Sequence, residues 1–267
     1  IKVSNRTDSY MWVEQKDYKS YVGVELDIYK KNMITVQTRS RVGRSYWELI
    51  HQNRTIKMLR DFFGGYFVTD AGRNRYWRPH DKPPTPVSSG CYLARARFNF
   101  ALIKPRMYLK KRSLEQPNAK SGITGYPLLD EMNPRIFTNN LVLPYLVAIW
   151  EDYFKFSFTV LLQYSEHRDS ALKRARLSQE HLESIAAGLQ SVEQALAETL
   201  SFQRPSVICS NFKLINPKFD LSRIFRKPYR RRKISLFDSI ESSVEDRNVF
   251  GHSGQMNLSF NDKKLET

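Results

Sequence analysis

The feature that most constrains the fold is a long apolar run in the middle of the chain, from Leu141 to Tyr164. Three charged residues, Glu151, Asp152 and Lys155, fall at the centre of this run. Charged side chains are expensive at the middle of a bilayer, whereas a bundle helix can turn them towards solvent or towards partners. The run therefore favours the core helix of a helical bundle over a membrane span.

Further helical patterns follow this run. Apolar residues recur at intervals of three and four over residues 169–201, which predicts one long helix; they are Leu182, Ile185, Leu189, Val192 and Leu196. Residues 205–217 begin and end with proline and interrupt the pattern. A short helix is expected to start after Asn216 or near Asp220.

The last helix is expected over residues 234–250, and its inner face is expected to carry Ile234, Phe237, Ile240 and Val244. The first bundle helix is expected to end near Gln163, and Thr138, Asn139 or Asn140 can cap its start. These helices predict an antiparallel all-α bundle over residues 138–267.

The N-terminal part mixes strand and helix patterns. Residues 21–29 and 33–38 alternate apolar and polar side chains around a Lys-Lys-Asn turn, which predicts a β-hairpin. Residues 45–63 indicate a helix that stops at two glycines, and residues 65–77 indicate a second hairpin. A basic helix is expected over residues 91–111, bent at Pro105.

The predicted fold class is therefore α+β, with three parts in chain order. A small basic α+β domain of no assigned family is expected over residues 1–115. Residues 116–137 contain several glycines and prolines. They are expected to connect this domain to the helical bundle at residues 138–267.

The composition is strongly basic, with a formal net charge of +16 and an isoelectric point near 9.8. Such a charge favours polyanions, nucleic acid first and an acidic membrane second, although an acidic protein partner is the alternative. The chain has two cysteines, Cys91 and Cys209, which suggest a reducing, cytoplasmic location. A single disulfide between them is the alternative. No cysteine and histidine cluster has metal-ligand spacing, so neither a metal nor another cofactor is expected.

An arginine followed five residues later by a histidine is the pattern most suggestive of chemistry. It occurs three times, at Arg75/His80, Arg176/His181 and Arg247/His252. The first pair encloses a proline and is expected in a loop, and the second is expected on a solvated helix face. Only the third has an asparagine, Asn248, directly after the arginine. The structural alternative is a helix C-terminus whose histidine compensates the dipole before a stop at Gly251 or Gly254.

The sequence Arg247-Asn248-x-x-x-His252 resembles the signature of the HEPN ribonuclease superfamily. The apolar run with Trp150 and Glu151 resembles the first helix of one HEPN subgroup, and the resemblance covers about residues 138–256. The chain departs from a minimal family member in a longer and more basic stretch at residues 205–233.

The resemblance implies a metal-independent endoribonuclease. His252 is expected to move protons at a ribose 2′-hydroxyl or at the leaving oxygen, and Arg247 to hold the scissile phosphate. Asn248 is expected to orient His252 or the phosphate. Glu151 is expected to fix Arg247, its first candidate partner, or else to tune His252. The alternative for Glu151 is an ordinary exposed position beside Asp152 and Lys155.

The resemblance also implies a homodimer through the bundle, and RNA, such as tRNA, as the substrate. A ribonuclease of this type is typical of toxins and of antiviral, abortive-infection effectors. Such effectors act alone or together with other subunits of a defence system. The alternative is a non-catalytic HEPN module that binds nucleic acid or a partner within such a complex.

A basic segment lies directly before the last helix and is expected to contact RNA phosphates without sequence preference. Its members are Arg226, Lys227, Tyr229, Arg230, Arg231, Arg232 and Lys233. Tyr229 can stack on a base. A solvated loop or a nuclear-import-like patch is the alternative for this segment.

Overall fold

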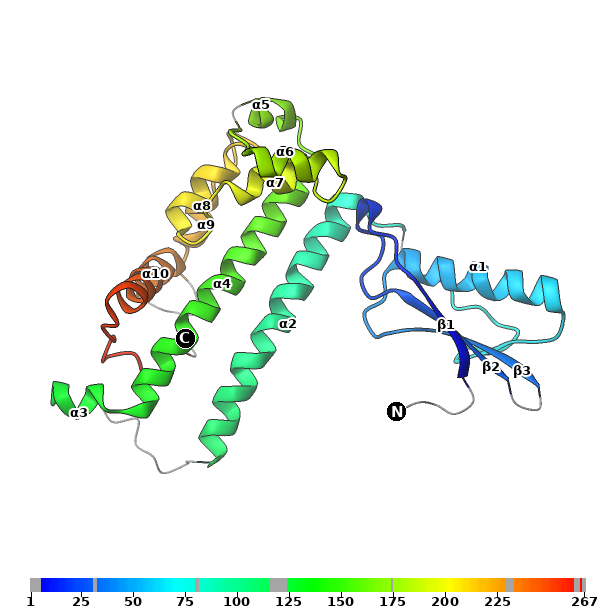
Figure 1. Cartoon of the computed structure of the whole chain (residues 1–267), viewed down its shortest axis with the longest axis horizontal. Helices are drawn as coiled ribbons and strands as arrows, with labels where there is room; N and C mark the ends of the chain where they lie inside the picture. The colour runs from blue at the N-terminus through cyan, green and yellow to red at the C-terminus, as the bar shows by residue number, and fades with distance from the viewer. Residues whose placement is uncertain are drawn as a thin grey trace. The chain divides into compact units, whose positions relative to one another are not determined.

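The computed structural model describes residues 6–30, 33–79, 82–115, 124–173, 175–228, 233–261 and 265. It confirms the α+β class, with an antiparallel sheet near the N-terminus and helices through the rest of the chain (Figure 1). The chain divides into two compact units, Ile1–Leu93 and Ala94–Thr267.

The sheet of the N-terminal unit contains three antiparallel strands in the order β1 (Arg6–Trp12), β2 (Val24–Lys30) and β3 (Ile34–Ser40). The predicted hairpin is confirmed as β2 and β3, paired from Val24↔Ser40 to Lys30↔Ile34. The outer strand β1 was not predicted from the sequence. The second predicted hairpin is reduced to β4 (Val68–Thr69) and β5 (Gly72–Arg73).

Helix α1 (Tyr46–Phe63) begins as the sequence indicates, because Ser45 and Glu48 form a reciprocal capping box. The Glu48 side chain is fully buried and also accepts hydrogen bonds from the backbone N–H groups of Tyr21 (2.9 Å), Val22 (2.8 Å) and Gly23. These donors satisfy the buried carboxylate and tie the loop after the short 3-10 helix η1 (Lys16–Tyr18) to α1.

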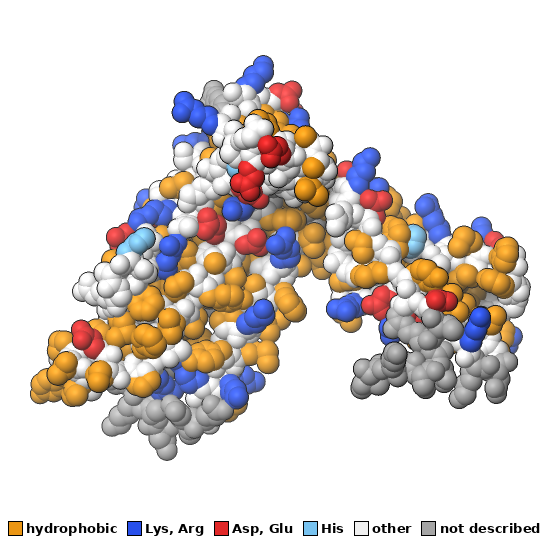
Figure 2. All heavy atoms as spheres, viewed as in Figure 1, with side chains coloured by type: hydrophobic (Ala, Val, Ile, Leu, Met, Phe, Trp, Pro, Cys, Tyr) orange, Lys and Arg blue, Asp and Glu red, His pale blue; other side chains and the backbone are white. Residues whose placement is uncertain are grey.

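Helix α2 (Pro86–Glu115) is longer than the helix expected from the sequence and contains Pro105. A proline cannot donate to the carbonyl four residues earlier, which here belongs to Ala101. The Tyr145 hydroxyl donates to that carbonyl at 3.1 Å and replaces the missing bond. Hydrophobic and basic side chains both lie along α2 in Figure 2.

The division between the two units lies inside α2, at Leu93 and Ala94, and not in the connecting segment expected at residues 116–137. The reason is that α2 makes side-chain contacts with α4 (Pro134–Gln163) from Arg97 onward. Phe98 contacts Tyr153 with ring centroids 5.0 Å apart, and Arg97 pairs with Asp152 at 3.2 Å. The basic helix assigned to the N-terminal domain is therefore largely part of the bundle unit.

Helix α4 is the predicted core helix, but it begins earlier than expected. Asn133 caps it and Pro134 occupies its first turn, after the short helix α3 (Pro127–Glu131). Asn139 and Asn140 are buried and bind the C-terminal segment instead of capping the helix. The Asn139 amide donates to the Phe260 carbonyl at 2.9 Å, and the Asn140 side-chain oxygen accepts from the Asn257 N–H at 3.0 Å.

The single long helix predicted over residues 169–201 is wrong. Three short helices occupy this region: α5 (Arg168–Leu172), α6 (Gln179–Ala186) and α7 (Val192–Glu198). Gly188 has a φ of +69°, a left-handed conformation that ends α6, and Ser191 starts α7 with a new capping box. Leu189, which was assigned to the helical stripe, is consequently exposed.

The remaining helices are α8 (Pro205–Phe212), α9 (Leu221–Phe225) and α10 (Leu236–Ser253). Pro205 starts α8 at its first position, so the segment expected to break the bundle contributes a helix to it. The short helix near Asp220 is confirmed as α9, and Asp220 caps it. The final helix is confirmed as α10, although Ile234 precedes it and is exposed.

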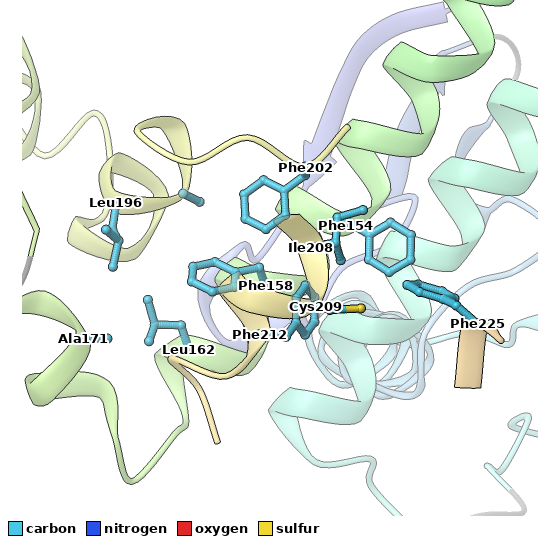
Figure 3. Packing of buried hydrophobic residues seen from close by; sticks show 11 residues of the cluster. Phe154, Phe158, Leu162, Ala171, Leu196, Phe202, Ile208, Cys209, Phe212 and Phe225 are labelled. Atoms are coloured by element: carbon cyan, nitrogen blue, oxygen red, sulfur yellow. The ribbon is translucent and has the colours of Figure 1, made fainter. Parts of the chain in front are cut away.

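An aromatic cluster forms the larger core of the bundle unit, where α4, α8 and α9 meet (Figure 3). Its phenylalanines are Phe154, Phe158, Phe202, Phe212 and Phe225. A smaller core lies where α4 meets α10, and its buried members are Leu143, Val147, Val244 and Phe260. The two cores fix α4, the region around residue 203 and α10 relative to one another.

Candidate functional site

Helix α10 carries the Arg247, Asn248 and His252 motif, and the smaller core sets which side of the helix faces inward. Val244 is fully buried against α4, and Asn248, one turn later, is half-buried. His252 lies in the last turn and is exposed, directly before Gly254 ends the helix in a left-handed conformation. The motif therefore runs from the interior to the surface along one helix.

Gln203 connects the two segments that the sequence singled out. Its side-chain nitrogen donates to Glu151 Oε2 at 3.0 Å, and its side-chain oxygen accepts a hydrogen bond from Arg247 Nη2. Trp150 Nε1 donates to the backbone carbonyl of the same Gln203 at 3.2 Å. Glu151, Gln203 and Arg247, all half-buried, form one hydrogen-bonded chain between α4 and α10.

The expected pairing of Glu151 with Arg247 is corrected by this arrangement. The sequence indicated a direct ion pair, whereas the structure places the Gln203 amide between the two side chains. An amide can donate to a carboxylate and accept from a guanidinium at the same time, so it suits this position. Gln203 lies in the loop between α7 and α8, and no local sequence pattern marks it.

Arg204 and Ser206 continue the attachment of this loop to α10. Arg204 pairs with Glu245 at 2.5 Å and with Glu241 at 3.3 Å. Glu241 Oε1 also accepts from the Ser206 backbone N–H at 2.9 Å and from the Ser206 hydroxyl at 2.6 Å. Partial burial acts to raise the pKa of Glu241, but the hydrogen bonds from Ser206 and Arg204 outweigh it and hold the pKa below its ordinary value.

We expect the stabilising effect of Glu241 to be lost in acid. Because its folded-state pKa is lowered, the contribution is present above the ordinary glutamate pKa and disappears as the pH falls through the lowered value. Urea unfolding of the wild type and Glu241→Gln should therefore differ most near neutral pH and converge in acid. A difference that does not depend on pH would show that the carboxylate charge has no part in it.

Arg247 and His252 lie at different angles around α10. Five residues of helix turn through about 140° and rise about 7.5 Å, so the two side chains do not stack. Within the described chain no residue hydrogen-bonds the His252 ring or the Asn248 side chain. The His252 imidazole is therefore exposed, whereas the Arg247 guanidinium is held by its hydrogen bond to Gln203.

The two competing arginine and histidine pairs differ from this arrangement. His181 lies in the first turn of α6, not in the middle of a helix as expected, and its Nδ1 is 2.9 Å from the hydroxyl of the capping Ser178. Its Nε2 lies 3.4 Å from Glu198. His181 therefore has a structural role at a helix start. His80 lies outside the described residues.

The basic segment before α10 is described only at its ends. The Arg226 guanidinium lies over the Phe237 ring at 3.9 Å and pairs with Asp238 at 3.6 Å, so it holds the start of α10. Lys227 and Lys233 are exposed. Tyr229, Arg230, Arg231 and Arg232 lie outside the described residues.

Comparison with known proteins gives no matching family model, curated protein or solved structure. Within the described ranges, no helix has the length and apolar character needed to cross a bilayer. The same residues contain no group of three or more His, Cys, Asp or Glu side chains placed to share a metal ion. Cys91 and Cys209 are both free thiols.

Proposed function

We propose that the chain is a metal-independent endoribonuclease of the HEPN type, with Arg247, Asn248 and His252 at its active site. One observation carries the proposal: Glu151 and Arg247, far apart in the sequence, are joined through Gln203 beside an exposed His252 on the same helix. The net charge of +16 supports a polyanionic substrate.

The proposed reaction is an internal attack within RNA. His252 takes the proton of a ribose 2′-hydroxyl or gives a proton to the leaving 5′-oxygen. The 2′-oxygen bonds to the adjacent phosphorus as the bond to the 5′-oxygen breaks, which leaves a 2′,3′-cyclic phosphate and a 5′-hydroxyl. DNA lacks the attacking group and stays intact.

Arg247 has hydrogen-bonding capacity beyond the N–H group that it gives to Gln203. In this proposal the remaining N–H groups bind the phosphate oxygens, whose negative charge grows in the transition state. Glu151 acts through Gln203 to fix the guanidinium. Asn248, one turn before His252, orients the imidazole or the phosphate.

The purified protein is expected to cut bulk tRNA in the presence of EDTA. The proposed chemistry uses only side chains of the protein, so a chelator should leave the rate unchanged within about twofold, a change of less than 0.5 kcal/mol in the barrier. End-group analysis should find 2′,3′-cyclic phosphate or its opened form on the 5′ fragments. A strict requirement for added magnesium, or cleavage of single-stranded DNA at a similar rate, would contradict the proposed mechanism.

A homodimer is part of the same proposal, because a cyclising cleavage benefits from an acid and a base and the motif supplies one histidine per chain. Val244 and Ile240 pack within their own chain, so this side of α10 is not available to a second protomer. The exposed end of α10 at His252 is the part left for a partner.

Mixing Arg247→Ala chains with wild-type chains tests whether sites are shared. If each site draws residues from both protomers, activity should fall faster than the wild-type fraction as the mutant is added. The same titration with Arg176→Ala chains provides the control and should leave activity unchanged. A fall in proportion to the wild-type fraction, together with an active monomer in sedimentation, would show that each chain works alone.

The second candidate is a non-catalytic HEPN module that binds RNA or a partner. It is favoured by one observation, namely that Arg247 donates a hydrogen bond to Gln203, which gives the guanidinium a structural role within the bundle. A role as a toxin or abortive-infection effector belongs to the catalytic proposal and requires that the cleavage assay succeed.

A further inference from the structure

Helix α2 has two apolar sides, and only one of them is covered within the bundle unit. On the covered side Ala94 and Pro105 are buried and Phe98 packs on Tyr153 of α4. The uncovered side, which we call the α2 seam, consists of Phe100, Ile103, Met107 and Leu114. Their exposed fractions are 69%, 43%, 66% and 72%, respectively.

The spacing of the α2 seam is that of a coiled-coil interface. Its members follow one another at intervals of three, four and seven residues, and they fall within about 60° of the helix circumference. Lys110 occupies the one position of this repeat that is not apolar. A second helix can bury such a narrow stripe by packing along it.

Basic side chains line both edges of the α2 seam. Lys104 and Lys111 lie along one edge and Arg106 along the other, and all three are exposed. From its start at Pro86, α2 contains no Asp or Glu before Glu115. In Figure 2 blue basic side chains accompany orange hydrophobic ones along the helix. Among the flanking positions, which select a coiled-coil partner by charge, Lys104, Arg106 and Lys111 are basic, Asn99 and Ser113 are uncharged, and none is acidic.

Contacts with α4 hold the helix in place and leave the α2 seam outward. Arg97 pairs with Asp152 at 3.2 Å, and Arg112 donates to the Asn139 side chain at 2.8 Å. Between these two points Tyr145 bonds the Ala101 carbonyl. The seam is thus presented by a fixed helix, which lowers the entropy cost of docking.

We propose that the α2 seam is the docking site for an amphipathic helix of a partner protein, with acidic residues beside its apolar stripe. Glutamates on the partner would pair with Lys104, Arg106 and Lys111 while its apolar residues cover Phe100 and Met107. The proposal is independent of RNA cleavage.

Charge and shape favour this occupant over the alternatives. A second copy of α2 would bring like charges together along the whole interface, which opposes pairing. A single-stranded nucleic acid stacks its bases on aromatic rings, but Ile103, Met107 and Leu114 are aliphatic and Phe100 is the one ring in the stripe. A membrane-surface helix buries a broader apolar face than this stripe offers.

The test measures binding of the full chain to two labelled helical peptides by fluorescence anisotropy. Both peptides have isoleucine and leucine at the core positions of about three heptads; one carries glutamate at the flanking positions and the other lysine. A single-stranded oligodeoxynucleotide, which has no 2′-hydroxyl to react, is the third probe.

The protein variants are the triple reversal Lys104→Glu, Arg106→Glu and Lys111→Glu, and a control of equal charge change. The control replaces Lys57, Lys213 and Lys218, which are exposed elsewhere, with glutamate.

The wild type and the control are expected to bind the glutamate peptide at least about tenfold more tightly than the lysine peptide. The triple reversal should invert this preference while circular dichroism and the melting temperature stay the same. Replacing Met107 with serine should weaken the binding of both peptides. Equal binding of the two peptides, no binding of either, or an unchanged preference in the triple reversal would overturn the proposal. Binding of the oligonucleotide alone, lost in the triple reversal, would also overturn it and assign the seam to nucleic acid.

Discussion

Replacing His252 with alanine is expected to abolish RNA cleavage and leave the fold unchanged. The imidazole is the proton-transfer group of the proposed mechanism, and removing a general acid or base costs about a hundredfold to ten-thousandfold in rate. Because His252 is exposed and no described residue hydrogen-bonds its ring, its loss leaves no buried partner unsatisfied. Cleavage of bulk tRNA under single-turnover conditions, with the melting temperature measured alongside, checks both parts.

The matched control for this variant is His181→Ala. His181 belongs to the competing motif and caps α6 through Ser178, so its removal should cost about 1 kcal/mol of stability. Its cleavage rate should stay near that of the wild type. Full activity in His252→Ala, or loss of activity in a folded His181→Ala protein, would show that the wrong motif has been assigned to the chemistry.

Replacing Phe158 with alanine is expected to destabilise the bundle by about 3–5 kcal/mol, because a fully buried phenylalanine leaves a cavity that neighbours fill only in part. Its ring packs against Phe202 at 5.2 Å and Phe212 at 5.7 Å, measured between centroids. Chemical denaturation at equilibrium measures the change in unfolding free energy.

Phe100→Ala serves as the control, since Phe100 is 69% exposed and its removal should change stability by less than about 0.5 kcal/mol. The core prediction also bears on the site. Phe154 packs on Trp150 at 4.5 Å, and Trp150 holds the carbonyl of Gln203, so loosening this core should also weaken cleavage. A Phe158→Ala protein of wild-type stability would contradict the assignment of this cluster as the main core.

Elements with a complete local signal could be predicted from the sequence. Helix α1, the alternating side chains of β2 and β3, and the apolar run of α4 each show a pattern among residues that are close together in the chain. Capping, strand alternation and helical burial depend on neighbours in the chain, so the sequence displays them directly. The order of these elements was enough to assign the α+β class.

Predictions failed where one local pattern admitted two structures. Leu182 and Leu189 fit a single helical stripe, but the left-handed Gly188 between them ends the helix. Pro205 was taken as an interruption, although proline is equally suited to the first turn of a helix, where it starts α8. Tertiary contacts accompany both outcomes: α7 packs on α4, and Phe212 of α8 contacts Phe154 and Phe158 of α4.

Residue patterns alone were enough to assign the fold class, the core helix and the residues of the candidate motif on α10. Contacts between distant segments placed Gln203 between Glu151 and Arg247, left His252 exposed and left the α2 seam uncovered within the bundle unit. The physical reason is that a hydrogen bond between distant segments depends on how the cores orient α4 and α10. A single glutamine in a loop carries no periodic or capping signal from which that orientation could be predicted.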